Sequence, residues 1–269
     1  MKVFITVDLE GVSGYARWDA ADRPRERELI TDDANAAAAG CFDAGADEVV
    51  VGEAHGNMRN LIPERLDPRA RFVSGEPKPL NHMAGLDSSF DAAMLVGYHA
   101  KAGTLNAVMC HTYSLSVFSL RFNGAEVGEL GTDAAIAGHF GVPVVLVAGD
   151  EAACREARDL LGAGVQTVAV KKGLGRFVAE MLPLEAARAA IRAGAAAGLR
   201  GRAACKPFVV PPPVRVEVTF TSPSHADALA GFPGLRRVDG CTVAHDGAAD
   251  FLQAHGWFDA AHFLAGARG

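Results

Sequence analysis

Two carboxylates stand where the first apolar run of the chain ends. Asp8 and Glu10 follow residues 2–7, a run of apolar and β-branched side chains that predicts a buried strand. Side chains two residues apart on an extended chain point the same way, so the two acids share a face. Like charges held close together raise each other's pKa unless a cation lies between them. The pair therefore indicates a metal site or, equally well, two solvated acids at a strand end.

Three more candidate ligands follow later predicted elements. His55 comes soon after a predicted strand that ends at Glu53, and His99 directly follows a strand predicted over 90–98. Glu129 opens a predicted helix. Taken singly, each has an ordinary explanation, such as a solvated histidine or an acid that interacts with the helix dipole. Because parallel sheets gather the carboxyl ends of their strands at one edge, we expect these side chains to converge with the first two acids.

A set of two histidines and three carboxylates restricts the choice of metal. Such mixed nitrogen and oxygen donors suit zinc, with manganese or cobalt as alternatives. Five donors exceed what one tetrahedral ion with an open position needs. The set therefore favours two ions, and Asp8 at the centre is the natural bridge between them.

The order of predicted elements indicates the fold class. Strands and helices alternate through most of residues 1–200, which predicts a mostly parallel sheet with helices on both faces. A proline-rich segment at 206–214 follows. We therefore expect a metal-binding catalytic α/β domain over 1–200 and a smaller C-terminal α+β domain or extension over 201–269. The latter is predicted to end in a helix over 246–264.

Composition excludes several classes of protein. The chain has 269 residues, 49% of them hydrophobic and 22% charged, as in ordinary globular proteins. A net charge of −6 provides no basic surface for nucleic acid. No run approaches the roughly 20 apolar residues that span a bilayer, and no signal peptide is recognisable, so we expect a cytoplasmic protein. The five cysteines form no C-x-x-C pair, which argues against a zinc ribbon or a disulfide framework. The later histidines are predicted to lie on the surface: His139, His225, His245, His255 and His262.

Six short motifs occur in a fixed order along the first half of the chain. They are V-D-L-E-G-V-S-G from Val7, A-H-G-N-M-R-N-L around His55, S-G-E-P-K-P from Ser74, G-Y-H-A-K-A-G-T around His99, M-C-H-T around His111 and V-G-E-L-G around Glu129. In this order they resemble the DppA-type D-aminopeptidase family, which are zinc metallopeptidases. The resemblance covers roughly residues 1–190 and becomes looser beyond them.

The resemblance implies an assignment of site residues and an activity. It implies a two-zinc site with Asp8 bridging the ions, and it leaves open how the other four ligands divide between them. The implied ligands are Asp8, Glu10, His55, His99 and Glu129. His111 takes the place of the family's catalytic histidine, and the family fold implies a ring-like homo-oligomer. We therefore expect a zinc-dependent aminopeptidase that removes the N-terminal residue of short peptides, with D- or L-preference left open.

Some neighbouring residues have open roles. Cys110 beside His111 is a structural residue or, less simply, a nucleophile. Lys78, Lys101 and Arg176 are candidates for binding a peptide carboxylate, although a solvated surface cation explains each of them more simply. Two alternatives to the function remain: another two-metal amidase or hydrolase, and a peptide-binding relative without catalysis. A phosphoesterase would usually require more cations or a phosphate-binding loop, and no such loop motif is present.

Overall fold

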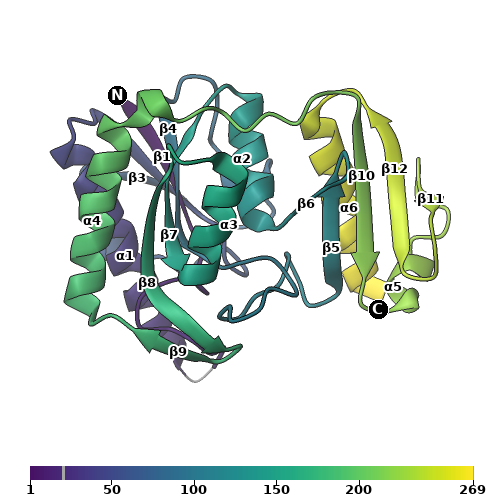
Figure 1. Cartoon of the computed structure of the whole chain (residues 1–269), viewed down its shortest axis with the longest axis horizontal. Coiled ribbons are helices and arrows are strands. Elements are labelled where there is room, and N and C mark those ends of the chain that lie inside the picture. The colour runs from purple at the N-terminus through teal and green to yellow at the C-terminus, as the bar shows by residue number, and fades with distance from the viewer. Residues whose placement is uncertain (20–21, 269) are drawn as a thin grey trace.

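The computed structural model describes residues 1–19 and 22–268 (Figure 1). In this part of the chain a seven-stranded sheet has the order β3-β2-β1-β4-β7-β8-β9. Its strands are β1 (Lys2–Val7), β2 (Glu48–Glu53), β3 (Arg71–Val73), β4 (Ala92–Tyr98), β7 (Val144–Asp150), β8 (Gln166–Gly175) and β9 (Val178–Met181). All neighbouring pairs are parallel except β8 and β9, which are antiparallel.

Helices cover both faces of this sheet. On one face lie α1 (Arg23–Asp43) and α4 (Leu184–Arg200), which pack against each other; on the other lie α2 (Glu129–His139) and α3 (Glu151–Leu161). Val3, Ile5 and Val7 of β1 pack with α1 and α4, whereas Phe4 enters the core that contains α2. A strand buried on both faces has no polar alternation, which is why the first apolar run is continuous. The predicted mostly parallel α/β fold is confirmed.

A second, antiparallel sheet lies beside the first (Figure 1). Its order is β11-β12-β10-β5-β6. The strands are β5 (Val117–Phe122), β6 (Ala125–Val127), β10 (Val214–Phe220), β11 (Arg236–Arg237) and β12 (Thr242–Ala248). The short helix α5 (Pro223–Asp227) and the long helix α6 (Phe251–Arg268) pack against it. Short 3₁₀ turns also occur at η2 (Pro63–Arg65), η3 (Asn81–Met83) and η4 (Arg202–Ala204).

The final helix begins later than the sequence predicts. Residues 246–248, predicted to start the helix over 246–264, belong instead to strand β12, which pairs with β10. Asp246 is exposed there and forms ion pairs with Arg236 and Arg215. Helix α6 then begins at Phe251 and runs through Gly256 to Arg268. The pairing of β12 with β10, a strand distant in the sequence, thus outweighs the local helical pattern of residues 246–248.

The hairpin β5–β6 joins the two sheets in sequence and in space. Asn123 and Gly124 both adopt positive φ, 50° and 85°, as a tight hairpin turn requires. The hairpin lies within the first 200 residues, yet β5 pairs with β10 of the second sheet. The division into a catalytic domain over 1–200 and a smaller domain or extension over 201–269 stays a prediction.

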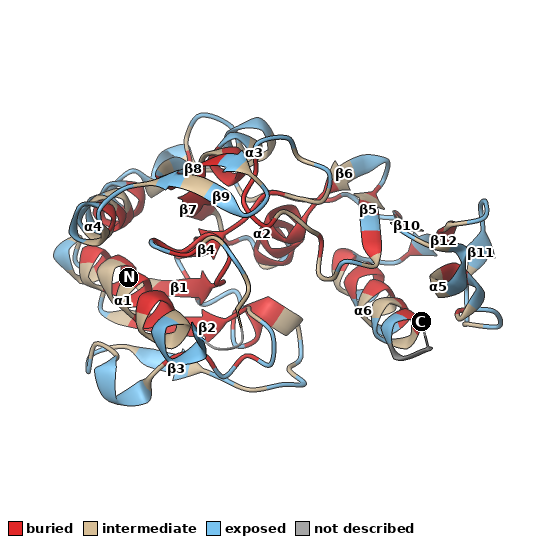
Figure 2. Cartoon of the chain, turned by 90° about the horizontal axis from the view of Figure 1, so that it is seen from below, coloured by how far each residue is buried: buried red, intermediate tan, exposed pale blue. Residues whose placement is uncertain are grey.

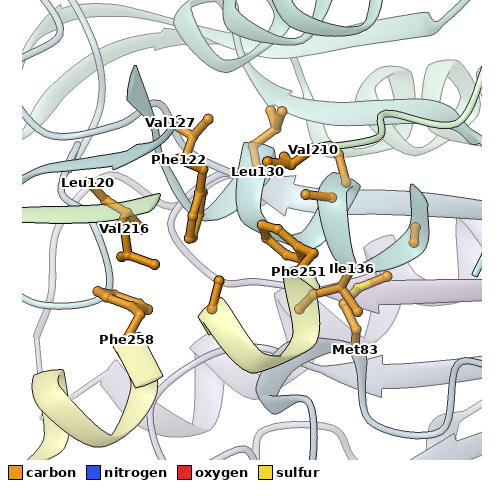
Figure 3. Packing of buried hydrophobic residues seen from close by; sticks show 14 of the residues in the cluster. Met83, Leu120, Phe122, Val127, Leu130, Ile136, Val210, Val216, Phe251 and Phe258 are labelled. Atoms are coloured by element: carbon orange, nitrogen blue, oxygen red, sulfur yellow. The ribbon is translucent and has the colours of Figure 1, made fainter. Parts of the chain in front are cut away.

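Helix α6 is attached by an aromatic core. Phe251 and Phe258 point from α6 toward the second sheet and α2, as Figure 3 shows. The rings of Phe122 and Phe251 lie 4.8 Å apart in an edge-on arrangement. Figure 2 shows the consequence: α6 is buried along the side that meets α2 and the second sheet. No helix among the described residues is long and apolar enough to cross a membrane.

Candidate metal centre

Three neighbouring strands deliver three of the predicted ligands. Strand β1 lies between β2 and β4, with Val7 in register with Glu53 on one side and Val96 on the other. Asp8 directly follows β1, so it lies between His55, which follows β2, and His99, which follows β4. The sheet order therefore makes Asp8 the central residue of the group.

The distances show that the two oxygens of Asp8 face different histidines. Oδ1 lies 3.4 Å from His55 Nδ1, and Oδ2 lies 3.4 Å from His99 Nε2. Glu10 Oε2 lies 2.9 Å from His55 Nδ1, while Glu129 Oε1 lies 3.4 Å from His99 Nε2. His55 is half-buried and the other four are buried. All five predicted ligands thus lie in one cluster.

His111 lies against the same cluster. Its Nε2 is 3.6 Å from Glu129 Oε1, and its ring stacks on His99 with 4.1 Å between centroids. Nδ1 lies 2.9 Å from the carbonyl oxygen of Met109. Donation to that carbonyl places the proton on Nδ1 and leaves Nε2 directed at Glu129. By position alone, His111 can act on a substrate or bind a metal together with His99 and Glu129.

Neighbouring groups hold the ligands in place. His99 Nδ1 lies 3.0 Å from the carbonyl oxygen of Ala100, which leaves its Nε2 facing the carboxylates. The indole nitrogen of Trp18 donates to Glu10 Oε1 at 2.5 Å. The backbone nitrogen of Tyr113 donates to Glu129 Oε1 at 2.6 Å. Neither Trp18 nor Tyr113 was predicted from the sequence, because neither belongs to the residue types expected as ligands.

Main-chain contact sets the spacing between the first turn and strand β4. A Cβ atom at Gly97 would lie 2.1 Å from the carbonyl oxygen of Asp8, and Gly97 has φ of +72°. A Cβ atom at Gly11 would lie 2.0 Å from the carbonyl oxygen of Tyr98. Gly11 N donates to Gly97 O at 2.7 Å. Only glycine permits this approach, which brings Asp8 next to His99.

A buried lysine holds the other side of the first turn. Lys171 Nζ, from β8, donates to the carbonyl oxygens of Glu10 at 2.6 Å, Val12 at 2.9 Å and Tyr15. All three donors of the ammonium are thereby used. The sequence offers little to distinguish buried Lys171 from exposed Lys172, because the only signal is the alternation of faces along a strand.

The charges in the cluster require a cation or protons. Burial raises the pKa of Asp8, and the nearby charge of Glu10 raises it further. Burial alone would lower the pKa of His55, but Glu10 and Asp8 outweigh it and raise that pKa to about 10. A bound cation would take over this positive charge.

Donor chemistry and unsatisfied atoms both fit a metal. Asp8 Oδ2 and His99 Nε2 are buried and have no hydrogen-bond partner among the described residues. Buried polar atoms are rarely left unpaired unless something else binds them. The donors are imidazole nitrogens and carboxylate oxygens, which zinc accepts at short distances. The residues present therefore fit zinc.

The cluster opens into a cavity of about 1180 Å³. Its lining includes the segment 76–82 and helix α6, which contributes Asp259 and His262. His262 was predicted to lie on the surface, and this is wrong: it is half-buried, and its Nε2 lies 3.0 Å from Ser114 Oγ. His255, also predicted at the surface, is buried. Both errors arise because the packing of α6 depends on contacts with residues far away in sequence.

The three candidate cations for a peptide carboxylate lie in different places. Lys78 lines the cavity, whereas Lys101 and Arg176 are not among the described residues that line it. Arg176 lies over the rings of Trp18 and Phe177. Cys110 is half-buried, and its Sγ contacts the carbonyl oxygen of Thr104 at 3.5 Å, which accords with a structural role.

Comparison with known proteins identifies the family. The sequence profile of the family described as D-aminopeptidase matches residues 1–260. A D-aminopeptidase of Bacillus subtilis (strain 168) is 35% identical over 260 residues, which cover 95% of this chain and 94% of the relative.

A solved structure gives the same result. The Zn-dependent D-aminopeptidase DppA from Bacillus subtilis, described as a self-compartmentalizing protease, superposes with a TM-score of 0.94 at 33% identity. The match covers 98% of each chain. It confirms the resemblance found in the six motifs and the prediction of a peptidase. With its fold, ordered motifs and sequence all in agreement, this chain belongs to the D-aminopeptidase family.

Proposed function

We propose that the protein is a zinc-dependent aminopeptidase that removes the N-terminal residue from short peptides, including peptides that begin with a D-amino acid. The observation that carries the proposal is the buried Asp8 carboxylate, whose two oxygens face His55 and His99 from opposite sides. The Zn dependence and the activity of the similar Bacillus subtilis enzyme support the choice of metal and reaction.

The distances favour one division of the ligands. Glu10 with His55 would hold one zinc ion and Glu129 with His99 the other, and Asp8, which faces both histidines, would be shared between them. Zinc bound here supplies a Lewis acid and lowers the pKa of bound water toward neutrality.

The residues around the cluster have separate roles in this proposal. While its Nδ1 donates to the carbonyl oxygen of Met109, His111 can accept a proton at Nε2 and then donate it, either to the oxyanion that develops on the scissile carbonyl or to the leaving amine. Trp18 and the main chain of Tyr113 keep Glu10 and Glu129 oriented. The substrate's amino group would bind a zinc ion or a nearby carboxylate at this centre, which accounts for a preference for a free N-terminus.

We also propose a homo-oligomeric, ring-shaped assembly in the cytoplasm. The support is the similar enzyme's description as self-compartmentalizing. Analytical ultracentrifugation should show one species several times the mass of the 28.0 kDa chain. Sedimentation as a monomer at micromolar concentration would contradict this assembly.

One experiment tests the activity. Metal content is measured, and a panel of D- and L-aminoacyl anilides and nitrophenyl phosphate is assayed with and without chelator. We expect bound zinc and chelator-sensitive cleavage of the anilides, but no cleavage of the phosphate ester. Cleavage of the phosphate alone would favour a phosphoesterase. Peptide binding without hydrolysis of any substrate would favour a non-catalytic relative.

A further inference from the structure

We propose that Lys78 binds the C-terminal carboxylate of the substrate, so that the enzyme selects short peptides with a free carboxylate over their amides. The inference rests on the proposed function and adds a substrate class to it. It arises from how charge is distributed in the cavity and from the unused hydrogen-bonding capacity of Lys78.

Lys78 is distinctive within the cavity. Among the described residues that line it, Lys78 is the only lysine or arginine. The other basic groups there are imidazoles, and two of them, His55 and His111, belong to the metal cluster. Three of the lining acids, Asp8, Glu10 and Glu129, also belong to the cluster. The cavity therefore contains the metal cluster and, elsewhere on its wall, one permanent cation among the described residues.

The ammonium group of Lys78 retains free donors. Its Nζ donates to the carbonyl oxygen of Glu53 at 2.5 Å. No carboxylate of the described residues lies within the 4.0 Å of Nζ that defines an ion pair. An ammonium group has three donors, so two remain for a ligand. Lys78 is half-buried, and in such surroundings a charge-assisted hydrogen bond is stronger than one in open water.

The charge state suits this role at neutral pH. Burial lowers the pKa of Lys78 to about 8, while the charges of Glu53 and Asp133 oppose that decrease. Most Lys78 side chains are therefore protonated at pH 7. A short peptide is a zwitterion, with its ammonium and carboxylate groups at opposite ends. The metal cluster, where the amino group binds in the proposed reaction, and Lys78 both line one cavity.

Lys78 could instead serve only to offset the charge of Glu53, and that role would give a different result. Glu53 is buried, and its Oε1 has no hydrogen-bond partner among the described residues. If Lys78 only offset the charge of Glu53, its loss would lower the stability of the fold. The ratio of activities toward a free peptide and its amide would then stay unchanged.

The experiment compares D-alanyl-glycine with D-alanyl-glycinamide. We measure kcat/KM for both in the zinc-loaded wild type, Lys78→Met, Lys78→Arg and Lys206→Met. Lys206 is exposed in the proline-rich segment, so its replacement removes the same charge away from the cavity. We expect Lys78→Met to lose about tenfold to a hundredfold on the free acid, as for a hydrogen bond to a charged group. Its activity on the amide should change less than about threefold.

The controls define the outcomes. Lys78→Arg should retain most of the acid preference because it keeps the charge, and Lys206→Met should match the wild type. Equal losses on acid and amide in Lys78→Met, or equal wild-type activity on both, would overturn the proposal. The latter result leaves the aminopeptidase function intact.

A binding measurement separates this proposal from the proposed function. Calorimetry with the zinc-loaded His111→Ala variant gives dissociation constants for both ligands without turnover. Adding Lys78→Met to this variant should weaken binding of the acid alone. If the wild type hydrolyses neither ligand, the proposed function fails, but the acid–amide difference in affinity still decides the role of Lys78.

Discussion

The parallel sheet and the antiparallel sheet contribute to the same cavity by different means. Strands β1 and β4 end directly before Asp8 and His99, and β2 ends two residues before His55. Main-chain contact at Gly11 and Gly97 sets the spacing between the first turn and β4. The antiparallel sheet contributes through α6, which is held by side-chain packing of Phe251 and Phe258. One site can thus combine a centre fixed by backbone contacts with a wall whose position depends on side-chain packing.

This contrast leads to separable expectations. Changes at the edge of the parallel sheet should alter metal binding and the chemical step. Changes on α6 should alter substrate affinity and leave the metal in place. The four variants below test that separation, beginning with the largest expected effect.

Asp8→Ala should have the largest effect. It removes the carboxylate that faces both His55 and His99, so we expect loss of both zinc ions and a fall in kcat/KM of at least about a thousandfold. Elemental analysis and anilide hydrolysis measure the two effects. Asp159→Ala, an exposed acid on α3, should behave as the wild type. Retention of two zinc equivalents would show that Asp8 is not the bridge.

His111→Ala should separate chemistry from metal binding. We expect near-normal zinc content and a fall in kcat of about 10²- to 10⁴-fold, the range for loss of a general acid or base. Zinc loss in proportion to activity would mean that His111 is a ligand beside His99 and Glu129. Whether kcat alone falls or zinc is lost as well, the effect arises at the metal cluster and not at the α6 wall.

Lys171→Met should weaken metal binding without contact with the metal. The three carbonyl contacts of Lys171 hold the turn that carries Glu10, so we expect zinc affinity to fall about tenfold to a hundredfold, as for other residues that orient ligands. Competition with a fluorescent chelator measures the affinity, and kcat should recover at saturating zinc. Lys172→Met, the exposed neighbour, is the matched control. Lower stability with unchanged zinc affinity would contradict a positioning role.

His262→Ala should have the smallest effect. It removes the hydrogen bond between His262 on α6 and Ser114, which helps to hold this wall of the cavity in place. We expect KM to rise about fivefold, the size of effect that the loss of one hydrogen bond gives. Zinc content should not change. His139→Ala, an exposed histidine on α2, is the control. Loss of zinc in His262→Ala would break the proposed division between the two regions.

The parallel sheet was readable from sequence because its determinants are local. Residues 2–7 form a continuous apolar run with an acid at its end, and the strand order then brings Asp8 beside His55 and His99. The Asn123–Gly124 turn also has a local determinant, because its positive φ values suit few other residues. The ligand assignment itself stays a prediction until the variants above are measured.

The rest of the site depends on long-range packing. Lys171 lies 161 positions from Glu10, and nothing near it in the sequence indicates that it contacts that carbonyl. The start of α6 was misplaced because residues 246–248 pair with β10, and that contact is not local. His262 was misjudged for the same reason: only the assembled core determines which side of α6 faces the cavity.

The close approach at Gly97 also bears on how this site can change over generations. Apolar replacements in the two cores can accumulate without altering the separation of Asp8 and His99, because main-chain atoms set it. A side chain at Gly97 would collide with the carbonyl of Asp8 and push the two residues apart. Inherited variation in the core is thereby uncoupled from the geometry of the metal pair. A lineage can replace most of its core residues and keep its chemistry, provided that positions 11 and 97 remain glycine.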